Sequence, residues 1–342
     1  MDNLFSESVE RLFSQVATPV AIRAIEQGAS TNAMWQELEQ SGYLDALVPE
    51  AQDGAGLTLA QVFPMLLSAG KHAVPLPFAQ TMLARAWLTA AGVVPPSGAI
   101  TIAGLEASLL QNGAIQADTV PFGWVSQWVL ADLGDYAALL PVADADSEHA
   151  GGYGSLCATL RWNEWPATAV KIPLGSPLSL PDLAVLAAAA LASLMAGAAD
   201  RVLALTLDYA NQRSQFGKHI GKFQAVQSQI SVMAERTWAC RMAAQLACQG
   251  KAWAPQLLLA AVGKSRCSEA AAIIADIGHA VHGAIGVTQE YDLQLYTRRL
   301  REWRLCGGGE TYWASRIGAQ LLHHSDKSAL AFICDELSAG SQ

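Results

Sequence analysis

The chain has 342 residues, of which 52% are hydrophobic and 15% are charged. This length exceeds that of one ordinary hydrophobic core, and the apolar content excludes a disordered protein, so we expect two or three packed units. Lys and Arg number 21 against 30 Asp and Glu, which gives a net charge of −9. An acidic chain without a basic run is a poor partner for phosphate backbones, so we expect no nucleic-acid binding. The low charge also suggests that apolar surface is buried against another subunit.

The six cysteines predict neither a disulfide framework nor a metal site, because none stands in a CxxC pair or at the short spacing of metal ligands. We therefore expect reduced, buried thiols and no bound metal. The segment Met1–Leu4 lacks the basic start of a signal peptide. The uncharged, alanine-rich stretch Leu183–Ala199 is shorter than the roughly 20 residues of a membrane span, so we expect a buried helix, no membrane association and a cytoplasmic location.

Local patterns divide the chain into three zones. In residues 3–93 the pattern is helical, and Thr58 and Gln61 have the spacing of a capping box. Residues 94–177 hold short β-branched or aromatic segments, such as Ala99–Ile102, Trp128–Leu130 and Leu139–Val142, between Gly, Asp and Pro. From Ser179 the pattern is helical again to near the C-terminus.

This order of zones indicates an α+β protein, mostly α, rather than an alternating βαβ fold. We expect an N-terminal helical domain over residues 1–95, a small, shortened β domain over 96–177 and a C-terminal helical bundle over 178–342. The glycine clusters at 283–286 and 307–309 follow no predicted strand, which argues against a dinucleotide-binding fold.

The densest motif is RSQFGKHIGKFQAVQ, residues 213–227, which we predict to be a loop with two glycines and three cations between two amphipathic helices. Such a loop can present Arg213 as a bidentate clamp for an anion and Phe216 against a planar ring. The alternative is a plain helix–helix turn with solvated charges, which composition taken alone favours.

Two further segments are rich in glycine. In residues 279–291 small side chains allow the close approach of a ligand or a helix, and His282 has no evident partner for catalysis. The turn Cys306–Glu310 has backbone amides that suit a phosphate or a ribose edge, although a helix end and a tight turn give the same pattern. Four basic side chains just upstream are either solvated or neutralise a ligand: Arg298, Arg299, Arg301 and Arg304.

In this order and spacing the segments resemble the acyl-CoA dehydrogenase family. RSQFGKHIGKFQAVQ is similar to the family's R-x-x-F-G-x-x-I-x-x-x-Q stretch, and HGAIGVTQEYDLQLYTRR to its H-G-G-x-G-F/Y-T-x-E-Y segment and the following helix. WQELEQSGYLDALVPEAQDGAGL resembles its opening helices. The resemblance covers nearly the whole chain and implies a helical domain, a small β domain and a C-terminal four-helix bundle.

The resemblance implies an FAD-dependent oxidoreductase that desaturates an acyl-CoA thioester. A carboxylate removes the α-proton while the β-hydrogen passes as a hydride to the flavin, and electron-transferring flavoprotein is the implied acceptor. Arg213 would bind the FAD pyrophosphate across a subunit interface. The other residues implied to contact FAD are Gln215, Phe216, Gln224, His282, Gly283 and Glu310.

Neither usual position of the catalytic base holds a carboxylate in this sequence. Cys306 stands at the Glu of the family's Y-E-G-T, and Ala187 with Ala188 stands at the Glu-Arg pair of the first bundle helix. A cysteine thiol is a poor substitute base. Glu310 is the remaining candidate, although it is out of register.

The β domain departs from the family as well, because it is short and lacks the Thr/Ser-rich strands that hold the flavin ring; Ser126 is the one small hydroxyl in WVSQWVL. These losses predict a subunit that completes a partner's FAD site while its own active site is lost. The chain would work in an α2β2 assembly with a base-bearing paralogue, like the shorter subunit of two-subunit enzymes of steroid degradation. Two alternatives stay open: a self-sufficient homo-oligomeric dehydrogenase that uses Glu310, and an FAD-free scaffold subunit.

Overall fold

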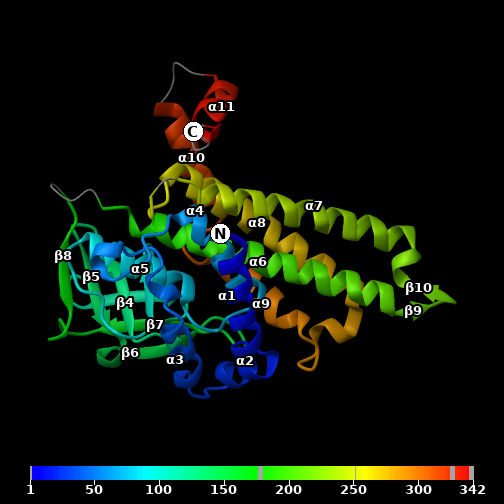
Figure 1. Cartoon of the computed structure of the whole chain (residues 1–342), viewed down its shortest axis with the longest axis horizontal. Coiled ribbons are helices and arrows are strands. Elements are labelled where there is room, and N and C mark those ends of the chain that lie inside the picture. Colours follow the sequence, from blue (N-terminus) through cyan, green and yellow to red (C-terminus); the bar gives the residue numbers. More distant parts are fainter. Residues whose placement is uncertain (1, 176–179, 251, 324–327, 339–342) are drawn as a thin grey trace.

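The computed structural model describes residues 2–175, 180–250, 252–323 and 328–338. Figure 1 shows a sheet domain at one end, long helices that run from it to the opposite end, and N-terminal helices between the two. The fold is α+β and mostly helical, as predicted. The helices are α1 (Asp2–Val16), α2 (Pro19–Glu26), α3 (Asn32–Gln40), α4 (Leu59–Lys71), α5 (Phe78–Ala90), α6 (Leu183–Gln212), α7 (Gln224–Ala247), α8 (Leu257–His282), α9 (Leu293–Leu305), α10 (Glu310–His323) and α11 (Ala329–Ser338).

The sheet domain consists of two four-stranded sheets with the strand orders β1-β4-β5-β8 and β2-β3-β7-β6. Strands β1 and β4 are parallel, and the other pairs in these two sheets are antiparallel. The three predicted segments of this region lie on strands β1, β4 and β5. The strands are β1 (Ile100–Ala103), β2 (Ala107–Leu109), β3 (Ile115–Val120), β4 (Trp128–Asp132), β5 (Tyr136–Pro141), β6 (Asp146–Ala150), β7 (Cys157–Trp162), β8 (Val170–Pro173), β9 (Ser214–Gln215) and β10 (Lys218–His219).

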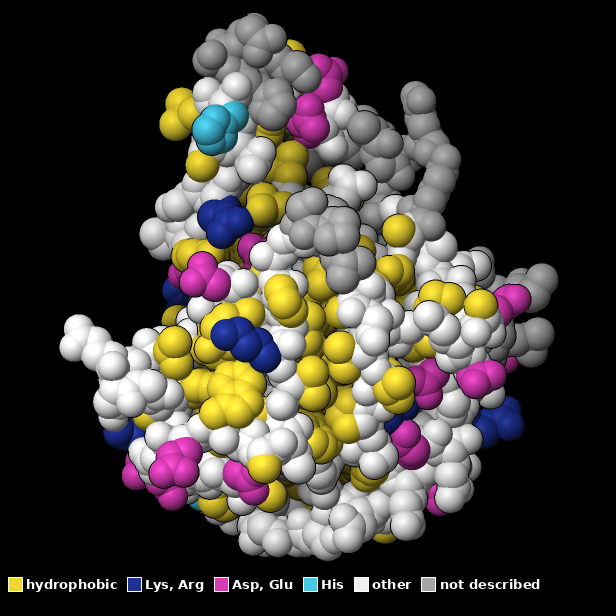
Figure 2. All heavy atoms as spheres, turned by 90° about the vertical axis from the view of Figure 1, so that its left-hand side faces the viewer, with side chains coloured by type: hydrophobic (Ala, Val, Ile, Leu, Met, Phe, Trp, Pro, Cys, Tyr) yellow, Lys and Arg dark blue, Asp and Glu magenta, His cyan; other side chains and the backbone are white. Residues whose placement is uncertain are grey.

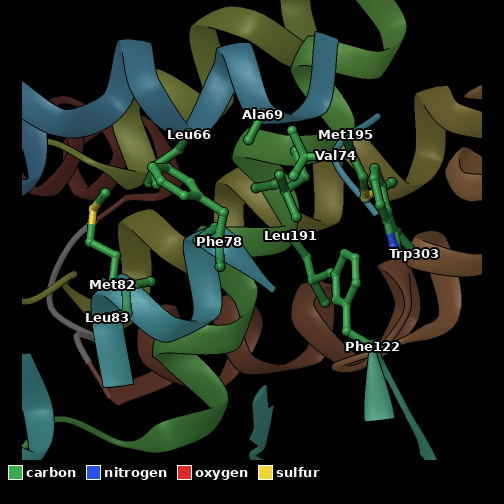
Figure 3. Close-up of a cluster of buried hydrophobic side chains, with 14 of the residues drawn as sticks. Leu66, Ala69, Val74, Phe78, Met82, Leu83, Phe122, Leu191, Met195 and Trp303 are labelled. Atoms are coloured by element: carbon green, nitrogen blue, oxygen red, sulfur yellow. The ribbon is translucent and has the colours of Figure 1, made fainter. Parts of the chain in front are cut away.

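The N-terminal helices pack on the bundle through α4. The predicted capping box is present, because Thr58 and Gln61 exchange side-chain to backbone hydrogen bonds at the start of α4. A Cβ atom at Gly70 of α4 would lie 2.0 Å from the Leu194 carbonyl oxygen of α6, so only glycine allows the two helices to approach this closely. Figure 3 shows the apolar cluster formed around this crossing by side chains of α4, α5 and α6, with Trp303 of α9 at its edge.

The helical bundle consists of α6, α7, α8 and α9, and α10 packs against α8. The alanine-rich first half of α6 is buried on all sides, as predicted for Leu183–Ala199. By length and composition alone, α6 and the segment Leu257–Val287 could span a membrane, but 94% of the apolar window of α6 is buried inside the fold. Protein packing therefore accounts for the apolar character of α6.

The surface at the sheet end also carries apolar side chains. Figure 2 shows them gathered in the centre of the face that lies at the left of Figure 1, with acidic side chains at its lower left and at its right. Helix α7 also exposes the apolar side chains of Val232, Trp238 and Met242. A surface with these apolar residues agrees with the expectation of a partner subunit.

Candidate functional site

One cavity lies where α6 ends and α8 ends, and we call it the hairpin pocket. Its volume is about 620 Å³. Within the loop predicted over residues 213–227, β9 and β10 form a short hairpin, and the C-terminal end of α8 lies against it. The hairpin pocket thereby joins two motifs that are about 70 residues apart. It is lined by Tyr209, Arg213, Gln215, Phe216, Ile220, Phe223, Val226, Gln229 and residues 280–285.

Five of the seven predicted cofactor residues line the hairpin pocket: Arg213, Gln215, Phe216, His282 and Gly283. Gln224 begins α7 next to the hairpin but is not among the lining residues. Glu310 lies near the other end of α8, because the Ser265 hydroxyl donates to its carbonyl oxygen. Seventeen residues of α8 separate Ser265 from His282, a helix length of about 26 Å. The structure therefore does not bring Glu310 to the other predicted residues.

The polar and aromatic groups of the hairpin pocket are available to a ligand. The Arg213 side chain is exposed and, within the described part of the chain, makes neither a hydrogen bond nor an ion pair. Phe216 is 91% exposed and has a φ of 51°, a left-handed conformation that costs energy in a bulky residue. A free guanidinium beside an exposed aromatic ring suits a nucleotide with phosphate groups.

His282 supports the wall of the hairpin pocket. It is buried, its ring stacks on Tyr209 at a centroid distance of 4.5 Å, and its Nδ1 lies 2.7 Å from the Gly278 carbonyl oxygen. Burial lowers the pKa of His282, so the ring is neutral at pH 7. These contacts give His282 a structural role, in agreement with the absence of a catalytic partner in the sequence.

The second cavity lies between the sheet domain and α9, and we call it the glycine-turn pocket because residues 306–308 form part of its wall. Its volume is about 890 Å³. Phe122 and Trp303 are buried in its wall with ring centroids 6.1 Å apart. Its lining consists of Leu105, Glu106, Asp118, Thr119, Phe122, residues 151–156, Arg298, Arg299, Arg301, Glu302, Trp303 and residues 305–308.

The four arginines of this region are all paired with carboxylates of the chain itself. Glu26 of α2 binds Arg298 at 2.8 Å and Arg299 at 2.7 Å, and Asp276 and Glu310 bind the other two. These pairs join α2, α8 and α10 to α9. The Arg301–Asp276 pair is also solvated, one of the two roles left open by the sequence, since 51% and 66% of its side chains are exposed.

The turn between α9 and α10 is fixed by a buried lysine that sequence reasoning missed. Lys264 of α8 is fully buried, and its Nζ donates to the Gly308 carbonyl oxygen at 2.8 Å, to the Arg304 carbonyl oxygen at 3.1 Å and to the Ser268 hydroxyl at 3.0 Å. Burial lowers the pKa of Lys264 to about 8. Gly307 and Gly308 have φ values of 63° and 84°, which few residues other than glycine adopt.

Glu106 lines the glycine-turn pocket and, like Lys264, has no signal in the sequence. It follows β1 in the sheet domain, and its Oε1 accepts a hydrogen bond of 2.8 Å from the Gly307 amide, 201 residues away. Only a long-range contact reveals this carboxylate, since its local sequence marks it as an ordinary loop residue.

The two positions of the expected base lie side by side at this turn. Cys306 lines the pocket, and a Cβ atom built on Gly307 would lie 3.9 Å from the Ala187 Cβ. Hydrogen bonding with the Cys306 thiol and burial raise the pKa of Cys157, the neighbouring cysteine of β7. The thiol of Cys157 is thus protonated at pH 7 and does not supply a base.

Glu310 is engaged in an ion pair with Arg304. The hydrogen bonds from Arg304 lower the pKa of Glu310 to about 2, and Glu310 is not among the residues that line the glycine-turn pocket. A general base is most effective with a pKa near the working pH, so this pairing argues against Glu310 as the base.

Comparison with known proteins agrees with this arrangement. The family model described as "Acyl-CoA dehydrogenase, C-terminal domain" matches residues 185–322. Acyl-CoA dehydrogenase IpdE2 of Mycobacterium tuberculosis is 31% identical over 309 residues, which cover 86% of this chain and 89% of that protein. The chain belongs to the acyl-CoA dehydrogenase family. The IpdE2 protein of Mycolicibacterium smegmatis is also 31% identical, over 86% of this chain and 91% of its own length.

Solved structures of this family have the same fold. A variant of the Tcur3481–Tcur3483 steroid ACAD has a TM-score of 0.79 and 24% identity, and covers 95% of this chain and 99% of the matched chain. The ChsE4-ChsE5 complex from Mycobacterium tuberculosis has a TM-score of 0.75 and 20% identity, and covers 96% of this chain and 98% of the matched chain.

The two pockets differ in how well they fit the FAD of the family. The hairpin pocket has a free guanidinium and an exposed aromatic ring, which fit the nucleotide end. In the sheet domain, the Thr101 hydroxyl donates to the Pro121 carbonyl oxygen at 2.6 Å and the Ser126 hydroxyl donates to the Phe122 carbonyl oxygen at 2.8 Å. Both hydroxyls are buried and their protons are donated, and neither Thr101 nor Ser126 is among the residues that line the glycine-turn pocket, so neither is placed to hold the ring end there.

Proposed function

We propose that this chain is a subunit of a two-subunit, FAD-dependent acyl-CoA dehydrogenase, in which it completes the FAD site of a paralogous partner that carries the catalytic base. The observation behind this proposal is the contrast between the pockets. The hairpin pocket keeps its polar groups free, whereas the positions of the base beside the other pocket hold Cys306 and Ala187.

In the assembly, this chain's residues would bind and orient the cofactor from the hairpin pocket. Arg213 would hold the pyrophosphate, because a guanidinium binds phosphate oxygens with two parallel hydrogen bonds. Gln215 and Phe216 would contact the nucleotide from the hairpin, while Gly283, with a φ of 64°, lets the backbone approach it. When bound, FAD supplies the hydride acceptor for the desaturation of the thioester.

A paralogous partner agrees with the neighbouring structures and with the surface. The ChsE4-ChsE5 structure is a complex of two proteins. On this chain, the exposed Trp238 and Met242 of α7 are apolar groups of the kind that subunit interfaces cover. The steroid ACAD among the neighbours suggests a bulky, ring-containing acyl-CoA as the substrate. The same proposal includes electron-transferring flavoprotein as the electron acceptor and a cytoplasmic location.

Flavin stoichiometry tests the proposal. The chain would be expressed alone and together with a base-bearing paralogue from the same genome, and the FAD of each purified sample would be counted by absorbance after denaturation. We expect little FAD in the lone chain and one FAD for each pair of chains in the complex, together with acyl-CoA desaturation. Full FAD occupancy and activity in the lone chain would overturn the need for a partner.

A further inference from the structure

The β9–β10 hairpin lies at the far end of the long helices, outside the packed core (Figure 1). Every residue from Arg213 to His219 is exposed, and each strand of the hairpin is two residues long. An isolated two-stranded hairpin is at best marginally stable in water. The hairpin therefore depends on local side-chain contacts to keep one conformation.

The turn of this hairpin is strained. Gln215 pairs with Lys218, so Phe216 and Gly217 form a two-residue turn, and their φ values are 51° and 77°. Positive φ at both central positions is the mark of a type I′ turn, which favours Asn followed by Gly. A phenylalanine in this conformation costs energy, and such strain is found mostly at sites of function. The turn itself therefore does not explain why the residue is Phe216.

The side chain of Phe223 contacts the hairpin at two points. Its ring lies edge to face with the ring of Phe216, with 6.2 Å between the centroids and an interplanar angle of 86°. The Lys218 ammonium of β10 lies 4.3 Å from the centroid of the same ring. Aromatic pairs and cation–π contacts of this geometry are attractive. One side chain thus holds both the tip and the second strand of the hairpin.

The backbone of Phe223 is itself fixed by the start of α7. Its carbonyl oxygen accepts from the Gln227 amide at 3.0 Å, and its amide donates to the Ile220 carbonyl oxygen at 3.0 Å. The side chain is half-buried and lines the hairpin pocket. Phe223 therefore connects a strained, exposed turn to a long helix at the wall of this pocket.

We propose that Phe223 is a positioning residue for the cofactor, which holds Phe216 in its strained conformation and so keeps the hairpin pocket formed before FAD binds. A pre-formed site binds more tightly, because the hairpin need not be ordered when the ligand arrives. The inference rests on the proposed function, since FAD is the ligand that the hairpin pocket would hold.

The dissociation constant of FAD from the complex with the paralogue, measured by flavin fluorescence, tests this role. Phe223→Leu should weaken FAD binding by about fivefold, the factor that corresponds to one aromatic pair. Phe223→Tyr keeps the ring, so it should stay within about twofold of the unaltered complex. Phe216→Asn suits the turn but removes the aromatic ring, so it should weaken FAD binding by about fivefold or more.

The double variant Phe216→Asn/Phe223→Leu distinguishes positioning from a general structural role. If Phe223 acts through Phe216, the double variant should bind FAD within about twofold of Phe216→Asn alone. Val226→Ala is the matched control, because Val226 lines the same pocket from α7, and its loss should multiply with that of Phe216→Asn. Losses that multiply in the Phe223 pair, or no loss in Phe223→Leu, would overturn the proposal.

A flavin-free measurement keeps the proposal testable if the complex does not bind FAD. In the lone chain, para-fluorophenylalanine in place of Phe216 gives a fluorine resonance that reports the neighbouring ring of Phe223. We expect Phe223→Leu to move this resonance toward its position in the urea-unfolded chain, and Phe223→Tyr to leave it in place. An unmoved resonance in Phe223→Leu would overturn the proposal, whatever the flavin stoichiometry of the complex.

Discussion

The hairpin pocket and the glycine-turn pocket differ in whether their polar groups are already paired with other groups of the chain. In the hairpin pocket the Arg213 guanidinium is exposed and without a partner among the described residues. In the glycine-turn pocket the Gly307 amide is bound by Glu106, and Arg298 and Arg299 are bound by Glu26. A buried or half-buried polar group is stable only when it is paired, and a binding site must leave that pairing to its ligand. Under the proposed function, this contrast means that the hairpin pocket is kept for a ligand and that the glycine-turn pocket has become structural.

The largest effect that we expect concerns the titration of Lys264 in the glycine-turn region. Burial lowers its pKa to about 8, below the 10.5 of a free lysine, so between these values the unfolded chain binds more protons than the folded one. Its contribution to the free energy of unfolding should therefore rise by about 3 kcal/mol from pH 8 to 10.5. The difference between the unaltered chain and Lys264→Met in urea unfolding measures this rise.

Lys171→Met is the control for this measurement, because Lys171 is exposed. It should keep the pH dependence of the unaltered chain. A Lys264→Met chain with the same pH dependence as the unaltered chain would contradict the assignment of the rise to Lys264, and would weaken the view of the turn as a structural element.

The second prediction concerns the hairpin pocket. Arg213→Ala should lower the affinity of the complex for FAD by about tenfold or more, because the hydrogen bonds of a guanidinium to phosphate are charge-assisted. The release of FAD, followed by its fluorescence, measures this change. Lys222→Ala, in the same loop, should retain most of the FAD. Unchanged FAD binding in Arg213→Ala would favour the alternative of an FAD-free scaffold subunit.

The third prediction concerns Glu310, whose ion pair with Arg304 leaves 29% and 35% of the two side chains exposed. Solvent screens such a pair, so Glu310→Gln should lower the free energy of unfolding at pH 7 by about 1 kcal/mol or less. Hydrogen bonds from Arg304 lower the pKa of Glu310 to about 2, so this contribution is present above pH 4.5 and is lost as the pH falls toward 2.

The turnover of the Glu310→Gln complex should remain within about twofold of the unaltered complex, since Glu310 lies outside the lining of both pockets. A hundredfold loss of turnover with FAD retained would instead establish Glu310 as the base. That result would favour the self-sufficient dehydrogenase.

The smallest effect is expected at Cys306. Cys306→Ser keeps the size of the side chain, and the proposed base belongs to the partner, so kcat of the complex should change by less than about twofold. The steady-state rate of acyl-CoA oxidation measures this change, with the unaltered complex as the reference. A tenfold loss would show that the glycine-turn pocket takes part in turnover and would remove the contrast between the two pockets.

Much of the local structure follows from the sequence. The Thr58–Gln61 capping box, the strand at Trp128–Leu130 and the buried helix from Leu183 depend on neighbours within a few residues, and each is present in the structure. The motif at 213–227 was predicted as a loop between helices. The structure shows a hairpin at Ser214–His219 within it, and the prediction is wrong for Gln224–Gln227, which begin α7. The placing of Arg213, Phe216 and His282 in one cavity agrees with the family motifs.

The sequence alone thus determined the family, the order of helices and strands, and the absence of a carboxylate at Cys306 and Ala187. Only the tertiary structure showed that Glu106 binds the Gly307 amide, that Lys264 fixes the turn, and that Glu310 lies about 26 Å along α8 from the hairpin pocket. The physical reason is that caps and periodicity are set by near neighbours, whereas the pairing of a polar group depends on which distant segment the packed core brings beside it.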